Sequence, residues 1–273
     1  MRSKASPSTE LVTQSEVLRL DASARTRYDS RRKKCSAISV NVMLQRMLNF
    51  EALIVTAPVF LFSLSMHEFM HAWMATRLGD PTPAYHGRLT MNPFAHYDPI
   101  GTTMGLLFRT FGWAKPVPVN ASVFRWPKRD MMLTALGGPA INAVLAVCFI
   151  LVFKMAQPYM VDSGSLGRWR APVEMIGRMA AYGAFLNIVL AVFNLIPLYP
   201  LDGHHILRGF LSFRAALAYD KTKHMGGYIL MGIILLSLSG GFSIIIRPTL
   251  FVLDLALTRH ELSTLGGVLG KLF

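Results

Sequence analysis

Residues 60–77 read FLFSLSMHEFMHAWMATR, in which the polar segment 67–71 interrupts an apolar run that starts near residue 53. The run is about as long as the ~20 residues that a helix needs to cross a bilayer. Residues four apart lie on one face of a helix, so His67 and His71 share a face in this arrangement. The stretch therefore predicts a membrane-spanning helix that carries two neighbouring imidazoles.

Apolar stretches recur along the chain and decide its fold class. The 273 residues are 52% hydrophobic and 16% charged, with a mean hydropathy of +0.40, which is outside the range of soluble domains. All but the second of five apolar stretches are long enough to span as helices. The stretches are 53–76, 99–113, 131–156, 176–198 and 226–253. We expect an all-α integral membrane protein: a bundle of about four transmembrane helices, a short re-entrant or interfacial segment, and small extended segments in the cytoplasmic loop.

The first 50 residues differ from the rest of the chain. They are polar and rich in Ser and Arg, with ten Lys or Arg residues against four acids. This composition is typical of a disordered tail; an organelle presequence is the alternative, and no apolar core of a secretory signal occurs before residue 50. We expect residues 51–273 to form one membrane-embedded domain, with a core at about 52–205 and an additional C-terminal span at 226–253.

The net charge of +13 bears on partners and orientation. Because the basic residues lie in the tail and between the spans, we expect contact with membrane lipids and no nucleic acid. The loops 77–130 and 199–225 hold seven and four Lys or Arg residues, against two in 157–175. Positive loops face the cytoplasm. We therefore expect a multi-pass protein of the cell (inner or plasma) membrane with the 67–71 side cytoplasmic, although the basic tail then lies outside.

The segment 67–71 has the spacing HExxH, which is typical of zinc metalloproteases. Two imidazoles one helical turn apart can bind one metal ion, and Glu68 between them can act as general base. A carboxylate inside a membrane helix costs about 2.5–3.5 kcal/mol, which favours a functional role. The alternative is a set of polar groups that hydrogen-bond between helices.

A catalytic zinc ion needs a third protein ligand in addition to His67 and His71. Asp202 is favoured, because the segment NLIPLYPLDG (194–203) ends an apolar stretch with two prolines that break the helix. Two spans separated by one other run in the same direction, so Asp202 should reach the side and depth of the two histidines. His204 is the next choice. The full set of candidates is His86, His96, Asp98, Asp162, Asp202, His204, His205 and His224.

Three motifs together resemble the site-2 proteases, which are intramembrane zinc metalloproteases. They are HEFMH (67–71), GGPAIN (137–142) and NLIPLYPLDG (194–203), and the segments GRLTMNPFAHYDPIG (87–101) and FGWAKPVPVN (111–120) also look like the small branch of that family without appended domains. The resemblance covers about residues 52–205. Tyr199, where the family usually has proline or a small residue, and the pair His204 and His205 depart from its pattern.

The resemblance implies roles for five residues. The positions that match His67, His71 and Asp202 bind zinc, one ion per chain. The position that matches Glu68 is the catalytic acid and base. The position that matches Asn194 assists at the site.

The expected reaction is hydrolysis of a peptide bond within a transmembrane segment of a membrane-protein substrate, by a zinc-activated water. Asn194 could bind the substrate backbone or the developing oxyanion, or serve only as a contact between helices. The proline-rich segment 113–120 is expected to be extended; it either pairs with unwound substrate or simply connects two elements. Asn142 either positions a helix or a water, or only packs. The alternative function is metal binding or transport without proteolysis.

Overall fold

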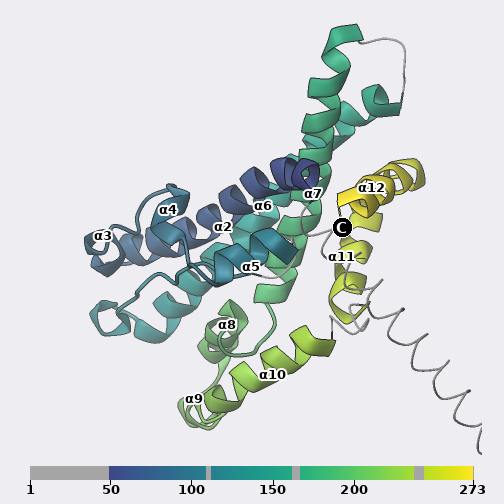
Figure 1. Cartoon of the computed structure of the whole chain (residues 1–273). Coiled ribbons are helices and arrows are strands. Elements are labelled where there is room, and N and C mark those ends of the chain that lie inside the picture. The colour runs from purple at the N-terminus through teal and green to yellow at the C-terminus, as the bar shows by residue number, and fades with distance from the viewer. Residues whose placement is uncertain (1–48, 109–111, 162–166, 237–242, 273) are drawn as a thin grey trace, which may run out of the picture. The chain divides into compact units, whose positions relative to one another are not determined.

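The computed structural model describes residues 49–108, 112–161, 167–236 and 243–272 (Figure 1). Within these ranges all regular elements are helices, as expected from the sequence. The predicted disordered tail lies, apart from its last two residues, outside the described residues. The α-helices are α2 (Phe50–Arg77), α3 (Thr82–Tyr85), α4 (Pro93–His96), α5 (Gly101–Phe108), α6 (Pro127–Val161), α7 (Arg170–Asn194), α8 (Asp202–Phe210), α9 (Phe213–Asp220), α10 (Lys223–Leu236), α11 (Ser243–Ala256) and α12 (Arg259–Leu272). Short 3-10 turns, η1 (Ala121–Val123) and η2 (Gly167–Trp169), precede α6 and α7.

Three of the described helices are long and apolar enough to cross a membrane. They are α2, α6 and the helix that continues from η2 into α7, and they match three of the four expected spans. The fourth expected span, 226–253, includes residues 237–242, which lie outside the described residues, and its described parts belong to α10 and α11. The expected interfacial segment at 99–113 contains α5, and residues 112–120 follow it without helix or strand.

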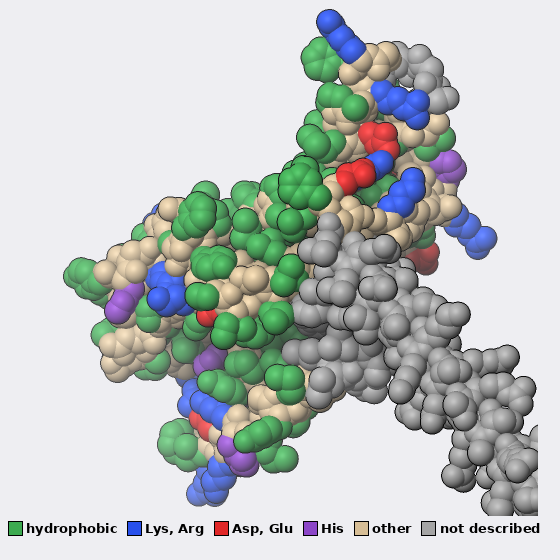
Figure 2. Space-filling view, in the orientation of Figure 1, with side chains coloured by type: hydrophobic (Ala, Val, Ile, Leu, Met, Phe, Trp, Pro, Cys, Tyr) green, Lys and Arg blue, Asp and Glu red, His purple; other side chains and the backbone are tan. Residues whose placement is uncertain are grey.

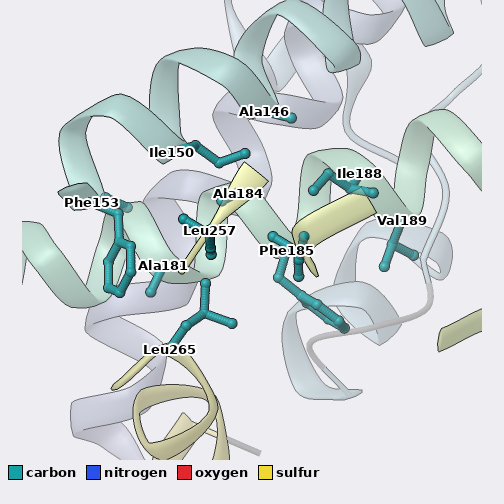
Figure 3. Packing of buried hydrophobic residues seen from close by; sticks show 12 residues of the cluster. Ala146, Ile150, Phe153, Ala181, Ala184, Phe185, Ile188, Val189, Leu257 and Leu265 are labelled. Carbon is teal, nitrogen blue, oxygen red and sulfur yellow. The ribbon is translucent and has the colours of Figure 1, made fainter. Parts of the chain in front are cut away.

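The helices α2, α6 and α7 pack side by side because small residues line their contacts. The Cβ of an alanine at Gly137 of α6 would stand 3.1 Å from the carbonyl oxygen of Met70 on α2, so glycine allows a closer approach here than any other residue. Alanines of α7 face α6 in the same way and form a buried cluster that Leu257 and Leu265 complete from the C-terminal part (Figure 3). This packing fixes the position of α2 along its axis relative to α6 and α7.

An arginine lies over a tryptophan ring near one end of each long helix. The pairs are Arg77 over Trp73 at the end of α2 (5.2 Å), Arg125 over Trp126 before α6 (5.7 Å) and Arg168 over Trp169 before α7 (5.5 Å). Because α2 and α6 run antiparallel, the first two pairs lie at the same end of the bundle, and the third lies at the other. Hydrophobic side chains cover the middle of the face in Figure 2, with Lys and Arg towards its ends. Tryptophan and arginine are common at membrane interfaces, so we expect the two ends of the spanning part at these pairs.

Candidate metal centre

Three side chains from two distant helices converge at one point. Nε2 of His71 lies 3.1 Å from Nε2 of His67, and both are buried on α2. The carboxylate of Asp202, the first residue of α8, reaches both rings: Oδ2 lies 3.2 Å from Nε2 of His67 and Oδ1 lies 3.3 Å from Nε2 of His71. Within the described residues this is the group of histidine, cysteine and acidic side chains that could hold a metal ion. The structure thus places Asp202 on the side predicted from the direction of the spans.

The loop between α7 and α8 brings Asp202 into position. After α7 ends, the chain turns back over itself, and the Cβ of an alanine at Gly203 would stand 2.2 Å from the carbonyl oxygen of Ile196 and 2.4 Å from that of Leu195. Such a close approach of backbone to backbone is open only to glycine. The Asp-Gly pair therefore combines a candidate ligand side chain with the residue that lets the loop fold under it.

The Nδ1 atoms of both histidines also have hydrogen-bond partners. Nδ1 of His67 donates to Oδ1 of Asn142 on α6, at 2.6 Å, and Nδ1 of His71 donates to the carbonyl oxygen of Thr134, at 2.9 Å. A hydrogen bond at Nδ1 fixes the tautomer and orientation of a metal-binding imidazole. Both Nε2 atoms of the neutral rings therefore carry a lone pair, and both point to the carboxylate.

The spacing of the four facing atoms, two imidazole nitrogens and the two carboxylate oxygens of Asp202, fits a zinc ion. A tetrahedral zinc site with bonds of about 2.05 Å places its ligand atoms about 3.3 Å apart, and the three distances here are 3.1, 3.2 and 3.3 Å. Oδ2 of Asp202 is buried without a hydrogen-bond donor. Two imidazole lone pairs and a carboxylate repel one another unless a cation lies between them, so the donor set suits zinc, which binds nitrogen and oxygen ligands.

Gly138 is part of the wall around the two imidazoles. A Cβ at this position would stand 2.5 Å from Cε1 of His67 and 2.5 Å from Nε2 of His71. The sequence GGPAIN in α6 therefore supplies two adjacent features of the centre: the space for the rings at Gly138, and the acceptor for His67 at Asn142.

A cavity of about 650 Å³ opens onto this group of side chains. Its polar lining includes Glu68, Asn194 and His205, together with the three converging residues, and apolar side chains of α2, α6, α7 and α10 also line it. The segment 112–120 runs along it, with Trp113, Pro116 and several neighbours in the wall. The arrangement offers a carboxylate, an amide and a metal-binding group to a molecule in a largely apolar space.

His205 faces the cavity as a neutral ring. Burial, together with the nearby His204 and the charge of Lys223, lowers the pKa of His205 to about 4. At neutral pH the ring is therefore an uncharged hydrogen-bonding group.

The remaining candidate ligands lie in other surroundings. His204 is fully buried but faces Asp220, with Nε2 3.5 Å from Oδ1, and its ring stacks on Tyr219 at 4.6 Å. His96 is buried with Nε2 2.9 Å from the carbonyl oxygen of Thr90, and Asp98 caps the start of α5. His86 and His224 are exposed, and Asp162 lies outside the described residues.

Comparison with known proteins gives the family. The pattern of peptidase family M50 matches residues 55–238, which contain the segment 67–71 as well as Asp202. The chain belongs to peptidase family M50. Membership confirms the resemblance to the site-2 proteases seen in the sequence, and a zinc metallopeptidase is the class of enzyme that it supports.

The names of individual relatives support the same class of enzyme. The chain is 39% identical over 145 residues to YwhC of Bacillus subtilis, which is named as a candidate zinc metalloprotease; the match covers 53% of this chain and 64% of that protein, just under two thirds. It is 28% identical over 214 residues, 77% of each chain, to Rip2 of Mycobacterium tuberculosis, which is named in the same way. No solved structure matches the chain significantly.

Two residues around this M50 centre were not singled out from the sequence, and only the first of them carries a signal there. Asn187 is fully buried in α7 and contacts Asn142; it is a polar residue within an apolar stretch, which is the signal that drew attention to Asn142. Gly138 carries no such signal, because glycines are common in membrane helices and their neighbours depend on how the helices pack.

Proposed function

We propose that this chain is an intramembrane zinc metallopeptidase that hydrolyses a peptide bond within or near a transmembrane segment of a membrane protein. The observation that carries the proposal is the convergence of His67, His71 and Asp202 at 3.1–3.3 Å beside a cavity that also contains Glu68. Family membership and the names of the relatives support the same class of reaction.

The proposed metal ligands are Nε2 of His67, Nε2 of His71 and the carboxylate of Asp202, for one zinc ion per chain. When bound, the ion supplies a Lewis acid that polarises the scissile carbonyl and makes water more acidic. These three side chains would hold the ion from α2 and α8, and all three line the cavity. A catalytic zinc site keeps one position for water or substrate, which the cavity could supply.

Glu68 is the proposed general base and acid. It follows His67 directly in α2 and lines the cavity, so its carboxylate stands beside the metal ligands without belonging to them. It would accept a proton from the attacking water and donate it to the nitrogen of the leaving amine. Asn194 lines the same cavity, and its Nδ2 donates to the carbonyl oxygen of Leu190, at 3.0 Å, which fixes the direction of the amide. We propose that this amide binds the substrate backbone.

The proposed substrate is a locally unwound, apolar segment of a membrane protein. Such a segment suits a cavity lined mostly by apolar side chains, and its freed backbone groups need partners. The segment 112–120, which has no helix or strand and runs along the cavity, is the proposed partner for that backbone. We propose a location in the cell membrane, with the metal centre nearer the cytoplasmic face, because the loops on its side are the most basic.

The test is Glu68→Gln in the purified, zinc-loaded protein with a transmembrane peptide as substrate. We expect zinc to be retained and cleavage to fall by about 10²-fold or more, since a positioned base contributes about that much. Glu51→Gln is the matched control: Glu51 lies on the same helix but pairs with Arg178, outside the cavity. Undiminished cleavage by Glu68→Gln would sink the mechanism. Zinc bound by the wild type without any cleavage would instead favour a metal-binding or metal-transport protein.

A further inference from the structure

Two buried amides link His67 to a backbone carbonyl of α7. Oδ1 of Asn142 accepts from His67, and Nδ2 of Asn142 donates to Oδ1 of Asn187, at 2.7 Å. Nδ2 of Asn187 then donates to the carbonyl oxygen of Gly183, at 2.8 Å, and to Oγ of Ser63 on α2, at 2.8 Å. Asn142, Asn187 and Ser63 are all 0% exposed, so the row of hydrogen bonds is closed to water.

The carbonyl of Gly183 sets the direction of every hydrogen bond in this row. A carbonyl oxygen only accepts, so Asn187 must present its NH₂ group to Gly183 and its oxygen to Asn142. Asn142 must then present its NH₂ group to Asn187 and its oxygen to His67. With both amides reversed, all other contacts could still form, but the oxygen of Asn187 would face the oxygen of Gly183 without a proton between them.

The direction of the row decides which nitrogen of His67 can bind a metal. An acceptor at Nδ1 requires the proton there and leaves the lone pair on Nε2, the atom that faces Asp202. A donor at Nδ1 would move the proton to Nε2 and block that atom. We propose that Asn187 is a positioning residue of the metal centre: together with Asn142 it holds His67 in the zinc-binding tautomer.

The neighbouring histidine shows why a second amide is needed. Nδ1 of His71 faces the backbone oxygen of Thr134, which can only accept, so one contact is enough to fix its tautomer. His67 instead faces an asparagine, whose two ends have nearly the same shape but opposite hydrogen-bonding roles. Without a group that distinguishes those ends, the buried Asn142 could turn either way, and only one orientation suits zinc.

The proposal rests on the metal centre of the proposed function, and zinc binding tests it separately from cleavage. In Asn187→Leu, which leaves Asn142 without its acceptor, we expect zinc affinity, measured by competition with a chelator, to fall about 10–100-fold, as for other lost partners of metal-binding histidines. In Asn142→Asp/Asn187→Leu we expect most of the affinity to return, because a carboxylate accepts from His67 whichever way it turns. Thr56→Val is the control: Thr56 is a fully buried residue of α2 whose hydroxyl donates to Ala52 within the same helix, and its loss should leave zinc affinity unchanged.

Two results would overturn the inference. One is an unchanged zinc affinity in Asn187→Leu; the other is an equal loss in the single and double variants, which would trace the loss to packing. A measurement on the wild type does not depend on the Asn187 variants: in ¹⁵N-histidine NMR of the zinc-free protein, at a pH where the ring is neutral and with the signal assigned by His67→Gln, the proton of His67 should be on Nδ1. A proton found on Nε2 refutes the role of Asn187 even if zinc binding and cleavage are normal.

Discussion

Gly138 lies directly against the ring of His71, with room for a hydrogen but not for a methyl group between the helix backbone and Nε2. The ring cannot move away, since its Nδ1 is bonded to the carbonyl of Thr134. The absence of a side chain at one position of α6 is therefore as much a part of the proposed metal centre as the proposed ligands are.

Gly138→Ala should abolish tight zinc binding. Its methyl group would stand 2.5 Å from atoms of both His67 and His71, and overpacking of this kind costs about 1–3 kcal/mol besides displacing the rings. Zinc content after dialysis, measured by atomic emission, gives the readout. Gly177→Ala is the matched control, because its methyl group would meet only the flexible end of Met160. A full zinc content in Gly138→Ala would show that the helices can separate at this point.

Asp202→Ala should lose zinc, and His204→Ala should keep it. The two residues are neighbours on α8, but Asp202 faces the two imidazoles and His204 faces Asp220. The comparison of zinc stoichiometry in the two variants decides between them as third ligand. Loss of zinc from His204→Ala with retention by Asp202→Ala would reverse the assignment.

Asp80→Ala should weaken substrate binding without loss of zinc. Oδ2 of the fully buried Asp80 accepts from the backbone N–H of Asn120 at 2.7 Å and so holds one end of the segment beside the cavity. Removing this acceptor should cost about 1–3 kcal/mol of unfolding free energy and raise KM for a transmembrane peptide more than it lowers kcat. Asp98→Ala is the control, because Asp98 accepts from the N–H groups of Ile100 and Gly101 within its own turn. An unchanged KM would remove the segment 112–120 from the substrate site.

The tryptophan of each Arg–Trp pair should lie at the headgroup level of a bilayer. Variants that retain only Trp73, or only Trp169, can be reconstituted in vesicles whose lipids carry bromine at different depths. We expect the strongest fluorescence quenching in both by bromine near the headgroups, because their arginine partners require water or phosphate. Strongest quenching of Trp73 by bromine at the chain ends would place the metal centre at a different depth.

The sequence predicted three membrane-capable helices of the described residues, and the meeting of Asp202 with the two histidines, for one reason: both depend on length and direction along the chain. HExxH fixes two side chains on one helical face, and the parity of the spans carries the Asp-Gly segment to the same side. No finer packing is needed to bring these groups together, and the structure agrees with the sequence at this level.

The surroundings of the ligands depend on rotation of the helices, which the sequence does not show. α2, α6 and α7 are apolar on all sides, so no hydrophobic face indicates which residues point inwards. The contacts of Gly138 and Asn187 follow only from how these helices pack. His96 and His204 illustrate the same limit outside the spans, because both are in the set of candidate ligands from the sequence and both are fully buried against other groups.

The position of the metal centre along α2 also determines how the products of a cut would partition. His71 is six residues from Arg77, which corresponds to about 9 Å along a helix. A substrate cleaved at that level would keep about a third of its membrane-crossing length on the near side and the rest on the far side. The short fragment would keep only about 6 of the ~20 apolar residues of a full span and the long one about 13, so the short fragment would leave the bilayer more readily. The register of two histidines on one helix would thus select which half of a severed protein becomes soluble.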